Sequence, residues 1–115
     1  MKQYTTPEQT AKLIEMGFEK PRNERWVLDV ANESTPSIQN IVKRQDYSIG
    51  ELIEMLPMDI NNDGRFESLL IHLNYHRWVV KYLGFFIEPT YQSCREELID
   101  ALYNMIIELK GEGMI

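Results

Sequence analysis

The sequence predicts a single α+β domain in which a small antiparallel sheet is packed by three helices. Three observations lead to this fold class. Three segments begin with Ser or Thr followed three residues later by Glu or Gln, the pattern of a helix capping box. Residues 66–83 alternate apolar and polar side chains in two runs, as paired strands do. The C-terminal segment repeats apolar residues every three or four positions, which is the period of a helix.

The first helix is predicted over residues 7–16. Thr6 and Gln9 form its capping box, and Pro7 takes the first helical position, where a missing N–H breaks no hydrogen bond. Gly17 is expected to end it. Its expected core side consists of Ala11, Leu13, Ile14 and Phe18.

The next part of the chain carries mixed signals of secondary structure. Residues 25–30 are β-forming in composition but alternate imperfectly, and we expect them to supply a third strand to the sheet. Without such a strand, the helices cover the hairpin directly. Residues 38–46 fit two structures, because Ile38, Ile41 and Val42 are β-branched and also have helical spacing.

A second helix is predicted over residues 49–56, capped by Ser48 and Glu51 and ended before Pro57. Residues 59–65 are polar and predict a loop. The alternating runs that follow predict a hairpin over about 66–83 with its tip at residues 74–77, and residues 84–92 are expected to connect it to the last helix.

The third helix is predicted over residues 94–110. Ser93 and Glu96 form its capping box, and Gly111 suits the position just after its end. Its apolar stripe is broad, so we expect the sheet to cover it. The stripe consists of Leu98, Leu102, Met105, Ile106 and Leu109.

Composition limits the classes of function. The 115 residues predict one domain over 1–115, and the net charge of −6 with a pI of about 4.9 disfavours binding to nucleic acid. No stretch approaches the ~18 apolar residues of a membrane span. The single cysteine excludes an intramolecular disulfide, and without a signal peptide the expected compartment is the cytoplasm. We expect no cofactor.

Three blocks carry a resemblance to known proteins: Thr6–Gly17, Tyr47–Pro57 and Glu97–Ile107. Together they resemble a family of small uncharacterised bacterial proteins often carried on prophages and other mobile elements. In that family a Trp-bearing strand pair lies between the second and third blocks, where Trp78 stands here. Residues 25–46 match no part of the family and have the character of an insertion. The resemblance implies a fold and a genomic setting, and it transfers no catalytic residue.

One motif has the spacing of metal ligands. Asp59, Asn61, Asp63 and Gly64 match positions 1, 3, 5 and 6 of a calcium-binding loop, and Glu67 offers an oxygen at position 9. The bidentate carboxylate of position 12 is absent, because that residue is Leu70. The alternative interpretation is a turn of Asn, Asp and Gly leading into a hairpin.

Three further side chains have chemistry to consider. Cys94, expected at the first position of the last helix, would have a lowered pKa there. A Cys–His nucleophile would need His72 or His76 within hydrogen-bond reach, and no local motif indicates this. The two histidines, about 13 Å apart along a straight strand, are too distant to share a metal.

The connector suggests a contact surface. Phe85, Phe86 and Ile87 either pin the hairpin to the last helix or form an exposed patch, and Ile107 lies on the far side of the helix stripe. The leading expectation is therefore a non-enzymatic cytoplasmic accessory protein that acts through protein contacts, including those of a homodimer. The alternatives are a weak calcium-binding regulator or enzyme using residues 59–67, and an acidic inhibitor that mimics nucleic acid.

Overall fold

The structure, a computed structural model, describes residues 1–28, 41–85 and 88–115. In these ranges the chain is α+β, as predicted, but its strands form two antiparallel sheets and not one. Strands β1 and β2 form one sheet, and the other has the order β3-β4-β5-β6. The elements in chain order are α1 (Pro7–Glu15), β1 (Glu24–Leu28), β2 (Ile41–Gln45), α2 (Ile49–Met55), β3 (Asp59–Asn62), β4 (Arg65–Asn74), β5 (Arg77–Leu83), β6 (Gln92–Arg95) and α3 (Leu98–Gly111).

The first two helices begin where their capping boxes predict. In α1 the Thr6 hydroxyl accepts from the Gln9 N–H, and the Gln9 side chain accepts from the Thr6 N–H; Ser48 and Glu51 repeat this in α2. The expected core side of α1 is wrong in part, because Ala11 and Ile14 are exposed. The helix meets the core through a narrow stripe formed by Thr10 and Leu13.

The last helix begins at Leu98 and not at residue 94, so the capping box predicted at Ser93 and Glu96 is not formed. Ser93 and Cys94 instead lie in β6, where Cys94 pairs with Val79 on β5. Glu97 occupies the N-cap without a side-chain hydrogen bond to the helix, and its carboxylate accepts from the Lys2 backbone N–H. The helix also ends one residue later than predicted, because Gly111 is helical.

The predicted hairpin is confirmed. Strands β4 and β5 pair from Ser68 with Leu83 up to Asn74 with Arg77, and Tyr75 enters the turn with a φ of 58°. The predicted loop at residues 59–65 is wrong in its first half, because residues 59–62 form edge strand β3 along β4. The predicted connector likewise ends one residue early, since β6 starts at residue 92.

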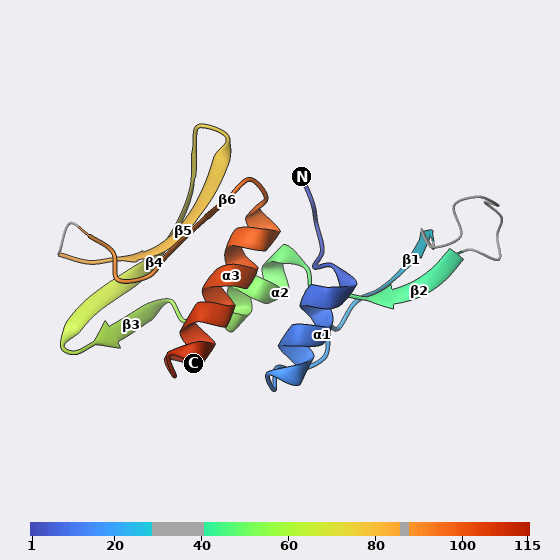
Figure 1. Ribbon diagram of the computed structural model, residues 1–115, viewed down its shortest axis with the longest axis horizontal. Helices are drawn as coiled ribbons and strands as arrows, with labels where there is room; N and C mark the ends of the chain where they lie inside the picture. Colours follow the sequence, from blue (N-terminus) through green and yellow to red (C-terminus); the bar gives the residue numbers. More distant parts are fainter. Residues whose placement is uncertain (29–40, 86–87) are drawn as a thin grey trace.

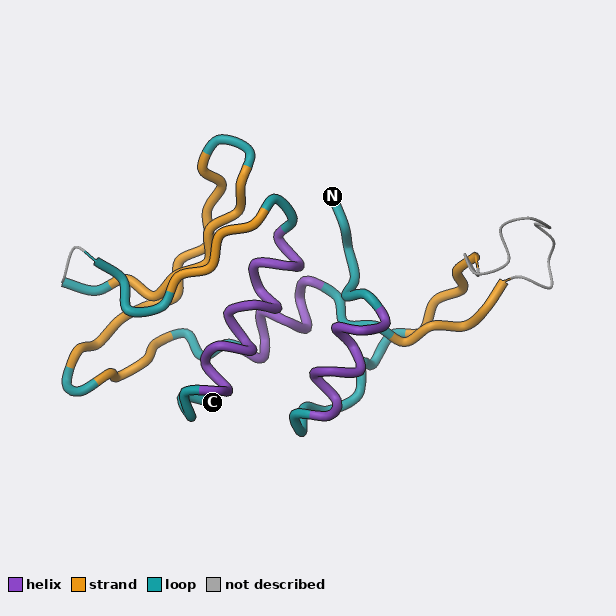
Figure 2. The backbone as a smooth tube through the Cα atoms, in the orientation of Figure 1, coloured by secondary structure: helices purple, strands orange, loops and turns teal. Residues whose placement is uncertain are grey.

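Helices cover one face of the four-stranded sheet. Helix α3 packs on β5 and β6, and α2 lies against α3 (Figures 1 and 2). This arrangement confirms that the broad apolar stripe of the last helix is covered by the sheet. The α3 side chains in the core are Leu98, Ile99, Ala101, Leu102, Met105, Ile106 and Leu109, and they meet Val80 and Tyr82 of β5.

The strand predicted at residues 25–30 exists as β1, but it does not join the main sheet. It pairs with β2, and the two strands form a ribbon that projects from the helices on the side away from the main sheet (Figure 1). The molecule therefore measures 56 × 33 × 18 Å. Trp26 on β1 is mostly exposed. Residues 29–30 of the predicted strand and residues 38–40 of the segment that fits two structures lie outside the described residues. Residues 41–45 of that segment are strand.

Candidate functional site

The four-stranded sheet has one covered face and one open face. Because side chains alternate along a strand, the pairing register assigns each residue to a face. Leu69, Ile71, Val80 and Tyr82 share the face that packs on the helices. Among the described residues no helix packs on the opposite, open face (Figure 1).

Three exposed apolar side chains lie together on the open face. Phe66, Leu70 and Leu83 are 71%, 40% and 36% exposed. Ser68 pairs with Leu83, and Phe66 and Leu70 stand two positions before and after Ser68. Diagonal neighbours on a sheet face have Cα atoms about 7–8 Å apart, which is within reach of large side chains. We call Phe66, Leu70 and Leu83 the open-face cluster.

The polypeptide leaves the sheet beside this cluster. A Cβ atom on Gly84 would lie 2.5 Å from the Phe66 carbonyl oxygen, so the backbone at residue 84 runs directly against β4. The next residue, Phe85, is fully exposed. Of the other residues predicted to bind a partner, Phe86 and Ile87 lie outside the described residues, and Ile107 of α3 is partly buried against the core.

The side chains predicted to bind calcium do not converge. Asp59 accepts a hydrogen bond from the Ser68 hydroxyl at 2.6 Å, and Asn61 accepts one from the Gly64 backbone N–H at 2.9 Å. Asp63 lies in the turn with a φ of 52°. Glu67 is on the covered face and buried, where its Oε1 accepts from the Thr90 hydroxyl at 3.1 Å. In the described ranges no three His, Cys, Asp or Glu side chains are grouped to hold a metal ion.

Cys94 and His72 are both on the open face, in one row across three strands. His72 pairs with Val79, which pairs with Cys94. Two strand spacings separate the histidine and cysteine backbones by about 10 Å, and Val79 is buried between them. The pairing therefore separates the two side chains and does not assemble a Cys–His nucleophile.

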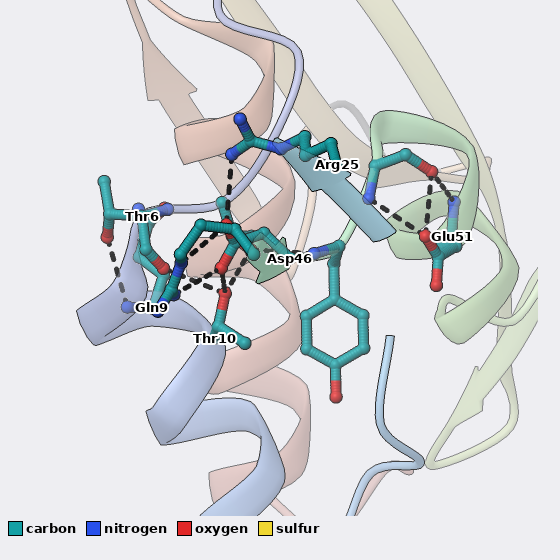
Figure 3. Close-up of polar contacts among 10 residues, drawn as sticks. Thr6, Gln9, Thr10, Arg25, Asp46 and Glu51 are labelled. Atoms are coloured by element: carbon teal, nitrogen blue, oxygen red, sulfur yellow. Dashed lines mark hydrogen bonds and ion pairs between the residues drawn. The ribbon is translucent and has the colours of Figure 1, made fainter. Parts of the chain in front are cut away.

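A buried polar cluster at the base of the ribbon was missed from the sequence. Asp46 is 1% exposed and accepts hydrogen bonds from Thr10 of α1 at 2.6 Å, from Arg44 of β2 at 2.8 Å and from Arg25 of β1 at 3.0 Å (Figure 3). Arg25 also stacks on the Tyr4 ring. Since Thr10 and Arg25 lie 36 and 21 residues from Asp46, no spacing rule could group them with it.

The electrostatics of this cluster favour the charged carboxylate. Burial raises the pKa of Asp46, but hydrogen bonds from Arg44 and Thr10 and the charges of Arg44 and Arg25 outweigh it, so the pKa lies below its ordinary value. With its oxygens occupied by donors from three elements, Asp46 has a structural role at the base of the ribbon.

A hollow of about 230 Å³ lies beside α2, next to the loop that follows α1. One of its three acidic residues, Glu51, already accepts from the Ser48 and Arg22 backbone N–H groups, and Tyr47 donates to the Glu19 carbonyl. Arg22 pairs with Glu54 at 2.6 Å. Glu51 and Glu54 are thus both paired with Arg22, which gives these three residues a structural role.

Comparison of the chain with protein-family models, with curated proteins and with solved structures finds no match. Within the described residues, no helix combines the length and the apolar content needed to cross a bilayer. The surface that distinguishes this chain is the open face of its sheet, since the Asp46 cluster and the paired groups beside α2 have structural explanations.

Proposed function

We propose that the protein is a non-enzymatic accessory protein that binds another protein through the open face of its four-stranded sheet. The observation that supports this is the open-face cluster. An antiparallel sheet with one face on helices usually presents polar side chains on the other. Single exposed apolar residues are ordinary, but several side by side mark a contact surface.

The surroundings of the cluster extend the same surface. Phe85 follows Leu83 by two residues and is fully exposed, so a second large aromatic side chain lies close along the chain to the cluster. Aromatic side chains are enriched at protein interfaces. Covering them removes a large apolar area from water, and each Å² removed contributes roughly 25 cal/mol of favourable free energy. A partner seated on the cluster therefore gains binding free energy without any rearrangement of the core.

Site-specific photocrosslinking in the cells that naturally make the protein tests this proposal. Benzoylphenylalanine replaces Leu70 in one variant and Ile14 in a control. The two positions are matched, because Leu70 is 40% exposed on the open face and Ile14 is 37% exposed on α1. We expect a defined adduct from position 70 and none from position 14.

A second substitution makes the crosslink specific to the surface. Adding Leu83→Glu to the position-70 variant should abolish the adduct, because a charge enters the cluster, while far-UV circular dichroism stays unchanged. No adduct at position 70, or equal adducts at both positions, contradicts the proposal.

A further inference from the structure

We propose that the open face accepts an acidic amphipathic segment of a partner protein, with apolar side chains for the cluster and carboxylates for the cations of the same face. This inference rests on the proposed function and specifies the chemistry of the partner.

Strand β5 places two cations on the open face, Lys81 next to the cluster and Arg77 at the hairpin tip about 13 Å further along. By the alternation of the strand, Arg77 and Lys81 share the open face with Leu83, and Lys81 pairs directly with Leu70. Within the described residues neither Arg77 nor Lys81 forms an ion pair or a side-chain hydrogen bond. Both charges are therefore available to a partner.

The open face differs in charge from the rest of the molecule. The acidic residue that the strand register places there is Asp59, and Ser68 already donates to it. Two cations and one carboxylate give the strands of this face a net charge of 2 − 1 = +1, whereas the whole chain carries −6. A face of opposite sign to its own molecule selects partners by charge complementarity and repels like-charged surfaces.

This charge pattern disfavours a second copy as the occupant. If two open faces packed together, the cations of one would lie against the cations of the other. Each face carries only one carboxylate, so the cations would outnumber the carboxylates that could pair with them. Nucleic acid is also disfavoured, because two cations neutralise few phosphates and the other surfaces of the acidic chain repel the backbone.

The position of Lys81 suits a mixed contact. Its side chain is half-buried beside Leu70, so its methylene groups extend the apolar surface while the ammonium group stays at the margin. Interfaces commonly combine an apolar centre with such a charged rim. An acidic amphipathic helix would present side chains of both kinds from one face.

Two model peptides test the inference. Both are amphipathic helices with the same leucine positions, one with glutamates and the other with lysines elsewhere. Titrated into the ¹⁵N-labelled full chain, the glutamate peptide should shift the amides of residues 66–70 and 79–83, and the lysine peptide should not. Raising the ionic strength from about 0.01 M to about 0.15 M, which shortens the Debye length from about 30 Å to about 8 Å, should weaken binding.

Charge reversal supplies the decisive comparison. Lys81→Glu should lower the affinity for the glutamate peptide about tenfold and permit binding of the lysine peptide. Lys12→Glu on the exposed side of α1 makes the same change of net charge away from the face, and it should leave both affinities unchanged.

The outcomes separate this inference from the proposed function. Equal binding of both peptides, no shift from either at millimolar concentration, or no effect of Lys81→Glu overturns the acidic partner and leaves the photocrosslinking result standing. Self-association that Leu70→Glu abolishes in sedimentation velocity, or the same shifts caused by an oligothymidylate, also overturns it. Failure of the crosslink at position 70 removes the proposed function itself.

Discussion

Arg25 reaches across the base of the β1–β2 ribbon and donates to the buried carboxylate of Asp46 at 3.0 Å. Arg44 donates to the same carboxylate from the other strand, and Thr10 donates from α1. One anion thus joins both strands of the ribbon to the first helix (Figure 3).

Asp46→Asn should lower the free energy of unfolding by about 2–3 kcal/mol. The substitution leaves two guanidinium groups without their anion, and breaking a buried pair by removing one partner costs about 3–5 kcal/mol. Here the arginines are about one-third exposed, which reduces the effect. Urea denaturation measures it. Glu24→Gln breaks the exposed pair with Lys43 as a control and should cost less than about 0.5 kcal/mol.

The stability should depend on pH through Asp46 and Asp100. Burial raises the pKa of Asp100, but hydrogen bonds from Lys2 and Gln9 and the charges of Lys2 and Arg95 outweigh it, so its pKa is lowered too. Because both pKa values are lower in the folded protein than in the unfolded chain, the unfolded chain binds protons more readily. The stabilisation that the two charged carboxylates provide is therefore present above pH 3.8 and is lost as the pH falls through their folded pKa values. The stability difference between wild type and Asp46→Asn should shrink in acid; a constant difference down to pH 2 contradicts this assignment.

Leu13→Ala and Ile14→Ala should lower the free energy of unfolding by very different amounts, although the two residues are neighbours on α1. Leu13 is fully buried, and its truncation leaves a cavity that costs about 2–4 kcal/mol. Ile14 is 37% exposed, so its truncation should cost less than about 1 kcal/mol. Thermal unfolding of both variants measures the difference, and equal losses would place Ile14 in the core.

Gly84→Ala should destabilise the protein, whereas Gly111→Ala should not. The added methyl group at residue 84 meets the Phe66 carbonyl oxygen at 2.5 Å, and a backbone atom cannot move aside as a side chain can. At residue 111 nothing lies within 4 Å, and alanine favours the helical backbone by up to about 1 kcal/mol. Denaturant midpoints of the two variants should move in opposite directions.

Local signals in the sequence predicted the local elements. The capping pairs at Thr6 and Ser48 predict the helix starts correctly because the residues directly after Thr6 and Ser48 are not paired in a strand and form a helix. Ser93 carries the same pattern and fails, because β5 has an open edge that residues 92–95 pair with before the helix starts. Ser93 is buried on the covered face, so pairing with a distant strand prevailed over the local cap signal.

Pairing across long stretches of sequence could not be predicted. Strand β3 is made of Asp59, Ile60, Asn61 and Asn62, which are mostly turn-forming residues, and it exists because β4 offers hydrogen-bond partners. A polar edge strand also resists unwanted pairing with other chains. In the same way, Glu24–Leu28 pairs with Ile41–Gln45, and these strands are too far apart in sequence for a short hairpin signal to predict the pairing.

The partner-binding residues predicted from the sequence differ from the open-face cluster. The exposure of Phe85 agrees with a patch at the connector, but the larger part of the open face came from the hairpin itself. The alternation of residues 66–83 shows that two faces exist, yet both faces contain leucine. Only the position of α3 decides which set is covered, so Leu70 and Leu83 could not be assigned beforehand.

The ribbon is joined to the helical part at a point where the chain nearly closes on itself, since Glu24 and Gln45 are paired at its base. A shorter ancestor or relative could bridge these two residues with a tight turn and keep every helix in place. Such a protein would lack both guanidinium groups, and a buried aspartate following the bridge would keep the Thr10 hydroxyl as a donor but would have no cation beside it. Proteins of this architecture without the ribbon should therefore carry an uncharged residue at the position of Asp46, which gives a marker for dating the gain or loss of the ribbon.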